Sequence, residues 1–198
     1  MANVECADPA SMNASLELVA PTGALRGSYL SLVEEFIAAG DKLVPFVLAF
    51  DNDDFDAFLA RLDACARGEG LPPGFVAHST WWLVRDASEV VAVSNIRHAL
   101  TAALLREGGN IGYGVRPSAR RRGFGTAILA KSLTQAAKLG LGRVLVTCAA
   151  TNPGSVKVIV RNGGIFESEE YLSDRNEVVQ RYWIDVKPSD RDTLEIRA

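Results

Sequence analysis

The chain has 198 residues, of which 48% are apolar and 23% charged, and this size and composition favour a single globular domain. Its net charge of −3, from 21 basic and 24 acidic residues, argues against a dedicated nucleic-acid-binding protein, which needs a broad positive surface. The three cysteines are scattered and predict no disulfide framework, and the two histidines lack metal-site spacing, so no metal is expected. The sequence shows no signal peptide and no apolar run long enough to span a membrane. These features predict a cytoplasmic protein without membrane contact.

The N-terminal part of the chain predicts one strand followed by two helices. The strand is expected at residues 15–20. A helix whose apolar residues recur at helical spacing follows and ends near Gly40. A proline leaves residues 42–50 mostly irregular, and residues 51–54 offer acidic caps for the second helix. A loop rich in glycine and proline follows at 68–74.

The remainder of the chain predicts the order β-β-β-α-β-α-β-β. The expected elements are strands at 78–86, 89–100 and 108–115, a helix at 122–139, a strand at 143–149, a helix at 153–162, and strands at 165–172 and 177–186. This order combines antiparallel hairpins with one β-α-β crossover, which is expected to be parallel and right-handed. The prediction is an α+β (mixed α/β) fold, with a mostly antiparallel central sheet of six to seven strands and about four helices.

The stretch "ARRRGFG" stands where a glycine-rich strand turns into a helix. Arg120, Arg121 and Arg122 precede Gly123 and Gly125, and free N–H groups at a helix start favour an anion. A dinucleotide fingerprint is excluded because its third glycine is missing, and a P-loop is excluded because Gly-Lys-Ser/Thr is absent. A phosphate cradle, a basic helix start without a ligand, and a nucleic-acid patch stay as alternatives.

The chain resembles the GCN5-related N-acetyltransferases (GNAT). "RRRGFGTAIL" is similar to their Arg/Gln-x-x-Gly-x-Gly/Ala pyrophosphate motif, and "VLVTCAATNPGSVKVIVRNGGIFES" is similar to the segment that follows it. "NIRH", "GYGVRPSARRRG" and "RYWI" look like one bacterial branch of predicted acetyltransferases with unassigned substrates. The resemblance covers about residues 15–186, which we take as one domain between a flexible N-terminal segment (1–14) and a C-terminal tail (187–198).

The resemblance implies an acetyl-CoA site between the strand before the motif and the strand after its helix. It assigns backbone contacts with the acetyl-pantetheine arm to Tyr113, Gly114 and Val115, and further cofactor contacts to Asn152 and Ser155. In the motif loop the pyrophosphate contacts fall to Arg120, Arg121, Arg122, Gly123, Phe124, Gly125 and Thr126. Gly112 and Gly114 share one strand face, which is either open for the ligand or tightly packed.

The chemistry that the resemblance implies is direct attack of an amine on the thioester. A backbone N–H near Val115 is the expected oxyanion contact. Many family members have a tyrosine acid seven residues after the asparagine, where this chain has Ile159. Ser155 and His98 are candidate proton-transfer residues, with a first-turn polar residue and a surface histidine as their ordinary interpretations.

The acceptor is expected to be an amine of a small molecule or of a protein. Asn95, Arg97 and His98 are the predicted substrate-side cluster, and either Trp81 or Trp82 is expected to line the acceptor cleft, with Trp81 chosen as the candidate. The alternative function is a non-catalytic acyl-CoA-binding sensor, which the isoleucine at the acid position favours. The prediction permits a homodimer and includes no nucleic-acid partner.

Overall fold

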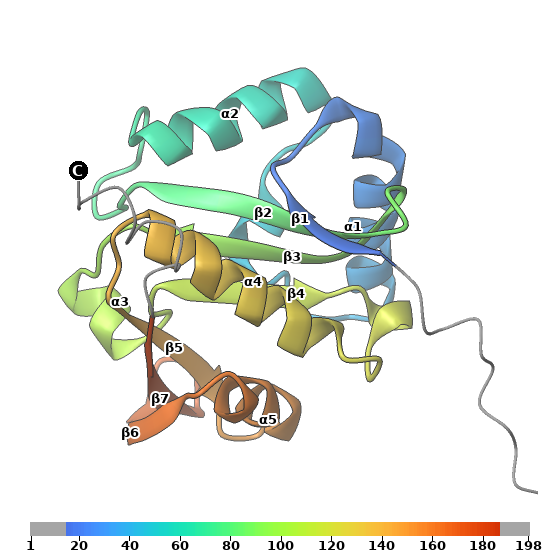
Figure 1. The fold of residues 1–198 in the computed structure, drawn as a ribbon. Helices are drawn as coiled ribbons and strands as arrows, with labels where there is room; N and C mark the ends of the chain where they lie inside the picture. Colours follow the sequence, from blue (N-terminus) through green and yellow to red (C-terminus); the bar gives the residue numbers. More distant parts are fainter. Residues whose placement is uncertain (1–14, 187–198) are drawn as a thin grey trace, which may run out of the picture.

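The structure, a computed structural model, describes residues 15–186, and the predicted N-terminal segment (1–14) and C-terminal tail (187–198) lie outside them. Figure 1 shows the arrangement of the elements. The α-helices are α1 (Arg26–Ala38), α2 (Phe55–Arg67), α3 (Ala102–Arg106), α4 (Phe124–Lys138) and α5 (Pro153–Arg161). The strands are β1 (Leu16–Val19), β2 (His78–Arg85), β3 (Glu89–Arg97), β4 (Ile111–Val115), β5 (Arg143–Ala149), β6 (Ile165–Leu172) and β7 (Glu177–Asp185).

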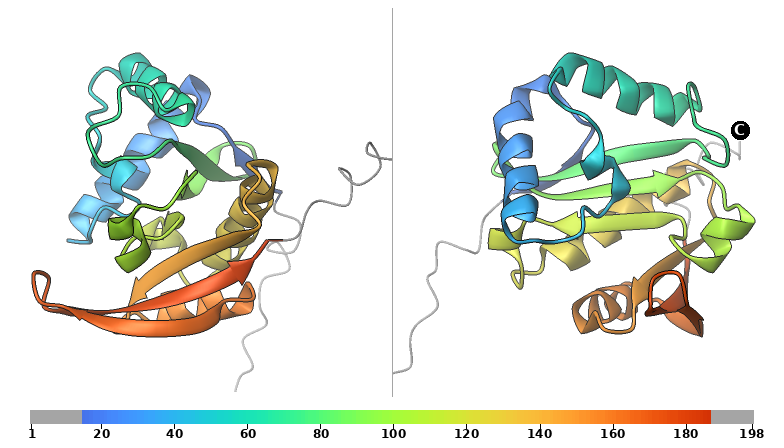
Figure 2. Two further views of the ribbon diagram at one scale, coloured as in Figure 1. Left: turned by 90° about the vertical axis from the view of Figure 1, so that its left-hand side faces the viewer. Right: turned by 180° about the vertical axis from the view of Figure 1, so that it is seen from behind.

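The strands form two sheets, where the sequence predicted one. The first has the order β1-β2-β3-β4 and the second the order β5-β7-β6, and every strand pair within them is antiparallel. The predicted β-α-β unit is present in the chain order β4-α4-β5, but its two strands do not form a ladder. They touch near their starts and then diverge, as Figures 1 and 2 show.

Helices cover both faces of the first sheet. α1 and α2 pack on one face and α4 on the other, and α5 packs beside α4 against β5 (Figure 2). Adjacent tryptophans of β2 therefore enter different cores. Trp82 stacks on Tyr29 of α1 with ring centroids 4.7 Å apart, whereas Trp81 packs into the cluster beneath α4. The alternation of side chains along a strand predicted this division.

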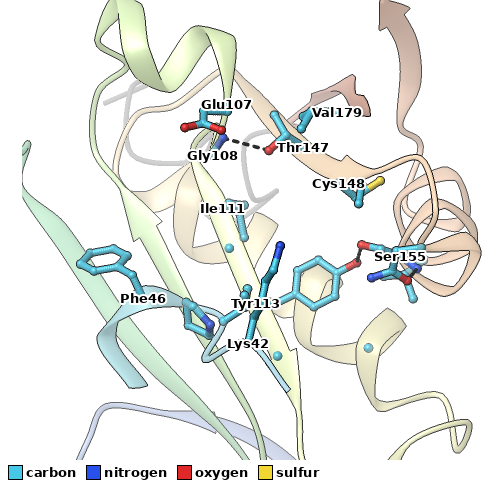
Figure 3. Close-up of a pocket in the computed structure, with 18 of the residues that line it drawn as sticks. Lys42, Phe46, Glu107, Gly108, Ile111, Tyr113, Thr147, Cys148, Ser155 and Val179 are labelled. Atoms are coloured by element: carbon cyan, nitrogen blue, oxygen red, sulfur yellow. Dashed lines mark hydrogen bonds between the residues drawn. The ribbon is translucent and has the colours of Figure 1, made fainter. Parts of the chain in front are cut away.

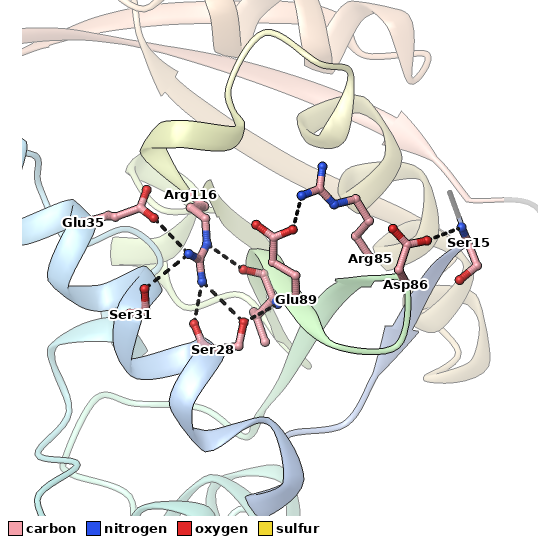
Figure 4. Close-up of polar contacts among 9 residues, drawn as sticks. Ser15, Ser28, Ser31, Glu35, Arg85, Asp86, Glu89 and Arg116 are labelled. Atoms are coloured by element: carbon pink, nitrogen blue, oxygen red, sulfur yellow. Dashed lines mark hydrogen bonds and ion pairs between the residues drawn. The ribbon is translucent and has the colours of Figure 1, made fainter. Parts of the chain in front are cut away.

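Arg116 joins α1 to the first sheet through a buried set of polar contacts (Figure 4). Its Nη1 lies 2.9 Å from Glu35 Oε1, its Nη2 donates to the carbonyl of Ser28 (2.6 Å), and its Nε donates to the carbonyl of Val90 (3.0 Å). Glu35 also accepts a bond from the backbone N–H of Ser118 (3.0 Å). One arginine of the "VRPSARRRG" stretch is thus bound entirely by the protein.

The predicted glycine-rich strand at 108–115 is shorter than expected. Gly108 and Gly109 have positive φ and belong to a turn, so β4 begins only at Ile111. The short helix α3, which Thr101 caps, is absent from the prediction and raises the number of α-helices from about four to five. Within residues 15–186, no helix combines the length and hydropathy needed to cross a membrane.

Candidate active site

A cleft of about 1160 Å³ opens where β4 and β5 diverge (Figure 3). The strands are held together at one end, where Asn110 N donates to Leu145 O (2.7 Å) and Leu145 N donates to Asn110 Oδ1 (2.8 Å). A Cβ on the neighbouring Gly109 would overlap the Leu145 carbonyl, so glycine permits this close approach. The contact closes one end of the cleft and leaves the rest open.

The pairing of β4 with β3 determines which backbone groups of β4 face the cleft. Arg97 N donates to Asn110 O (2.7 Å) at one end of the ladder, and Arg116 N donates to Val91 O (2.9 Å) at the other. Hydrogen-bonded pairs alternate along an antiparallel ladder. The even-numbered residues of β4 therefore bond to β3, and the odd-numbered ones turn their backbone groups toward the cleft.

Ile111, Tyr113 and Val115 thus present N–H and C=O groups along the wall of the cleft. The Val115 carbonyl accepts a bond from Arg120 Nε (3.2 Å). Gly114, which the sequence grouped with Tyr113 and Val115, also lines the cleft, but its backbone groups bond to β3. The free edge of β4 is therefore made by alternate residues rather than by three consecutive ones.

The opposite wall of the cleft comes from β5 by the same rule. Ala150 N donates to Val178 O (2.8 Å), so the even-numbered residues of β5 bond to β7. Thr147 and Ala149 then turn their backbone groups toward the cleft. The Thr147 hydroxyl accepts a bond from Gly108 N (3.0 Å), which draws the turn before β4 over this end of the cleft.

The face of β4 that carries Gly112 and Gly114 is packed, which decides between the two alternatives that the sequence left open. A Cβ on Gly114 would overlap the carbonyl oxygen of Val44, and one on Gly112 would lie 3.5 Å from Pro45. The irregular segment after α1 thus crosses directly over the strand. Because Gly112 and Gly114 have no side chains, the backbone of the segment after α1 can pack directly on β4. The segment also forms one rim of the cleft.

We expect Gly114→Ala to lower the free energy of unfolding by about 1–3 kcal/mol, because its methyl group overlaps a backbone oxygen that cannot rotate away. Gly112→Ala is the matched control, since its Cβ makes only an ordinary contact, and we expect a change within about 0.5 kcal/mol. Urea denaturation of both variants measures the difference. Equal stabilities would contradict the packing of Val44 on β4.

The start of α4 offers backbone donors to the cleft. Gly123 is its N-cap in the left-handed conformation (φ 86°), and no side chain caps the helix. Within residues 15–186, the N–H groups of Phe124, Gly125 and Thr126 have no acceptor. A 15-residue helix places its positive dipole end here, and Gly123, Gly125 and Thr126 line the cleft.

The three consecutive arginines have three different surroundings. Arg120 pairs with Asp41 (2.7 Å) and lines the cleft. Arg121 also lines the cleft and takes a positive φ of 63°. Arg122 does not line it and instead lies over the ring of Phe124, which is itself buried. Only part of the predicted motif loop therefore turns toward the cleft.

The start of α5 also lines the cleft, and the second half of this helix lies beside the start of α4. Asn152 Oδ1 accepts a bond from Ser155 N (3.0 Å) and caps the helix as predicted. Both residues line the cleft, and Lys157 and Arg161 of the same helix add positive charge. Within the described residues, no carboxylate lies within 4 Å of Arg121, Lys157 or Arg161.

Hydroxyl and thiol groups meet on the floor of the cleft. The Tyr113 phenol and the Ser155 hydroxyl share a hydrogen bond of 3.0 Å that spans the space between β4 and α5 (Figure 3). Burial raises the pKa of Tyr113 to about 12 and that of Cys148 to about 11. Both groups hold their protons at neutral pH, so Cys148 is a thiol rather than a reactive thiolate.

Ile159, at the position of the family tyrosine, is fully buried. It belongs to the core beneath α4 and α5 and does not line the cleft. A Cβ on the following Gly164 would overlap its side chain, so the chain after α5 packs tightly on it. This position therefore contributes packing and presents no proton donor.

The predicted substrate-side cluster is divided by the structure. Arg97 lines the cleft, whereas Trp81, Asn95 and His98 do not. Asn95 is fully buried and donates to Thr80 Oγ1 (3.1 Å) and His78 Nδ1 (2.9 Å). His98 Nε2 lies 2.8 Å from Ser79 Oγ, and burial lowers its pKa.

The part of the cleft nearest the segment after α1 and the turn before β4 includes residues that the sequence did not single out. They come from the segment after α1, the start of β2, the turn before β4 and the start of β7, and the notable ones are Phe46, Phe75, His78, Glu107 and Glu177. No spacing in the sequence links these segments. Among residues 15–186, no cluster of His, Cys, Asp or Glu could hold a metal ion.

Comparisons with known proteins agree with this geometry. A family model described as an acetyltransferase (GNAT) domain matches residues 40–165. No curated protein sequence matches the chain. Among solved structures, the acetyltransferase from Salmonella typhimurium that modifies the N-terminal serine of ribosomal protein L7/L12 is 18% identical and has a TM-score of 0.61, with 87% of this chain and 95% of that chain covered.

Two further solved structures are similar over most of the chain. A putative acetyltransferase from Salmonella typhimurium, with its cofactor acetyl-CoA, is 10% identical, with 88% and 96% of the two chains covered and a TM-score of 0.58. The dodecameric spermidine N-acetyltransferase from Vibrio cholerae is 13% identical, with 92% and 98% covered and a TM-score of 0.58. At these identities the likeness establishes the fold.

Proposed function

Because the chain belongs to the GNAT acetyltransferase family, we propose that it is an N-acetyltransferase that moves the acetyl group of acetyl-CoA to a primary amine. The observation that carries this proposal is the cleft between β4 and β5, with uncapped helix N–H groups at one end and a free strand edge along one wall. The acceptor is an amine of a small molecule or of a protein, attacked directly in a ternary complex.

The residues at the start of α4 fit the pyrophosphate of coenzyme A. The N–H groups of residues 124–126 lack partners, and Arg121, Lys157 and Arg161 supply positive charge that no nearby carboxylate neutralises. A Cβ on Gly123 would meet nothing within 4 Å, which leaves room for phosphate oxygens beside the backbone. Anions bind favourably where helix N–H groups and cations converge.

The free edge of β4 fits the pantetheine arm, because Tyr113 and Val115 offer both donors and acceptors there. When bound, acetyl-CoA supplies the activated thioester that an amine attacks. A backbone N–H of this edge, near Val115, is the proposed contact for negative charge on an acyl oxygen.

Ser155 is the residue proposed to hold the proton for the departing sulfur. Its hydroxyl is bonded to the Tyr113 phenol, whose own pKa of about 12 keeps it protonated. Ser155 Oγ thus carries the proton for the sulfur, and the hydroxyl of Tyr113 carries a second proton that can replace the one Ser155 gives up. His98 does not line the cleft in this structure and is not part of the proposal.

We expect Ser155→Ala to lower kcat by about tenfold to a hundredfold while the KM for acetyl-CoA changes little. The variant keeps the Ser155 N–H that Asn152 caps, so α5 is preserved. Tyr113→Phe, which removes only the second hydroxyl, should have the smaller effect. Steady-state thiol release measures both variants. An unchanged kcat in Ser155→Ala would remove this residue from the mechanism.

Calorimetry with acetyl-CoA tests the proposed ligand, and thiol release with a panel of amines tests the proposed reaction. Binding with turnover supports the enzyme. Binding without turnover on any amine supports the alternative of a non-catalytic acyl-CoA sensor, which the buried Ile159 favours. No binding at about millimolar acetyl-CoA would contradict both functions.

A further inference from the structure

Arg97 differs from the other cations in the part of the cleft nearest the segment after α1 and the turn before β4. Lys42 pairs with Glu177 (3.6 Å) and Arg175 with Glu107 (3.2 Å). Within residues 15–186, no carboxylate lies within 4 Å of Arg97. A partly buried charge without a counterion is costly in an isolated protein, so its presence in a ligand cleft points to an anion from outside the chain.

The hydrogen bonds of Arg97 fix the position of its guanidinium group and leave some of its N–H donors without an acceptor. Nη1 donates to the carbonyls of Gly108 (3.0 Å) and Gly109 (3.1 Å), and the guanidinium lies over the ring of Phe46 at 5.2 Å. In the described part of the chain, Nε and Nη2 have no partner. Two adjacent guanidinium nitrogens of this kind match the two oxygens of a carboxylate.

His78 adds a second unused donor at the same end. Its Nδ1 accepts from the side-chain amide of Asn95 (2.9 Å), so in the neutral ring the hydrogen is on Nε2. That Nε2 is buried without a hydrogen-bond partner within residues 15–186. The residue is 1% exposed, lines the cleft, and has its pKa lowered to about 4 by burial and by the charge of Arg97.

The groups around Arg97 and His78 indicate the rest of the ligand. Pro45, Phe46 and Phe75 form an apolar wall at this end of the cleft. Glu107, one residue before the turn that Arg97 binds, has a buried Oε2 without a partner in the described structure. A cation-binding oxygen and a pair of anion-binding donors thus border the same space.

We propose that Arg97 and His78 bind a carboxylate of the acceptor, so that the substrate is an amine that also carries a carboxylate, such as a free amino acid with an apolar side chain. This inference rests on the proposed acetyl transfer and names the class of acceptor. An acceptor with positive charges only, such as a polyamine, meets Arg97 unfavourably. The carboxylate also orients the acceptor, because a two-point contact fixes the direction of its amine.

Matched acceptors with and without the carboxylate test the inference. L-phenylalanine is compared with 2-phenylethylamine, L-tryptophan with tryptamine, and L-lysine with cadaverine, by thiol release with acetyl-CoA. We expect kcat/KM to be at least about tenfold higher for the carboxylated member of the preferred pair. Arg97→Gln should bring the ratio close to one by reducing turnover of that member.

Arg106→Gln is the control, because it removes an arginine that already has a carboxylate partner and lies outside the cleft lining, and it should keep the ratio. A ratio unaffected by Arg97→Gln, or preference for the decarboxylated amines, would overturn the inference. Acetyl-CoA binding without turnover of any carboxylated amine would also overturn it while leaving the cofactor proposal intact. If kcat/KM is higher for O-phosphoethanolamine than for every carboxylated amine, the anion that Arg97 binds is a phosphate, and the inference of a carboxylate is wrong.

A binding measurement gives a second readout. The chain has only two histidines, so the ring signals of His78 in an NMR titration are assigned with a single His98→Gln variant. A bound carboxylate favours the charged ring, so saturating amino acid in the presence of coenzyme A should raise the pKa of His78. An unchanged pKa of His78 at saturation would contradict its part in the site.

Discussion

Gly125→Glu is expected to weaken acetyl-CoA binding at least about a hundredfold, or about 2.8 kcal/mol. Gly125 lines the cleft in the first turn of α4, and a carboxylate there meets the pyrophosphate at the positive end of the helix dipole. A Cβ would lie 3.1 Å from Val158 and 3.7 Å from Val115, so the side chain also fills space between the strand and α5. Calorimetry measures the change in Kd.

Gly142→Glu is the control for this prediction. It adds the same charge at a glycine whose Cβ meets nothing within 4 Å and which lies outside the cleft lining. We expect wild-type affinity in that variant. Thermal denaturation of both variants shows whether Val158 shifts enough to disturb the fold. Wild-type affinity in Gly125→Glu would place the pyrophosphate elsewhere.

Arg116→Ala is expected to destabilise the protein by about 3 kcal/mol. The change leaves the carbonyls of Ser28 and Val90 without their side-chain donor and the Glu35 carboxylate without its ion pair. We place the effect at the low end for a buried pair because Glu35 is 29% exposed. Urea denaturation measures it, and Arg122→Ala, which removes an exposed arginine of the same stretch, is the control.

The destabilisation should shrink in acid. Burial raises the pKa of Glu35, but the hydrogen bonds from Ser118 and the charge of Arg116 outweigh burial and lower the pKa below its ordinary value of 4.5. The stabilisation from this carboxylate is therefore present above about pH 4.5 and is lost as the pH falls through the lowered pKa. A difference between wild type and Arg116→Ala that persists at a pH where Glu35 is protonated in the folded wild-type protein would contradict the ion pair.

The order and type of most elements follow from the sequence, because each carries a clear apolar period and an end signal. The helix α5 is one example, with Asn152 as cap and Pro153 in its first position. The division into two sheets does not follow from any period. In the part of the chain that the structure describes, β4 and β5 are joined only near their starts, by Asn110 and Leu145 beside a glycine that allows the approach, and no sequence pattern shows that the pairing stops there.

The candidate site is predictable only in part for a similar reason. The motif locates the start of α4, yet which of three consecutive arginines turns toward the cleft depends on the backbone, with Arg121 at positive φ and Arg122 over a ring. Trp81 and Trp82 were expected on opposite faces, and they are, but helices cover both faces. The part of the cleft nearest the turn before β4 combines segments such as those of Phe46 and Glu107, which no sequence pattern relates.

The contact between Asn110 and Leu145 has a consequence for how ligand and fold depend on each other. Beyond this contact, the facing edges of β4 and β5 carry backbone donors and acceptors that are not joined in a ladder. An extended ligand that bonds to both edges would bridge β4 and β5 where, within residues 15–186, no strand joins them. Any such ligand binds the folded chain and not the unfolded one, so occupancy raises resistance to unfolding in proportion to the logarithm of ligand concentration. The proposed binding of acetyl-CoA would thus stabilise the fold as well as supply the acetyl group.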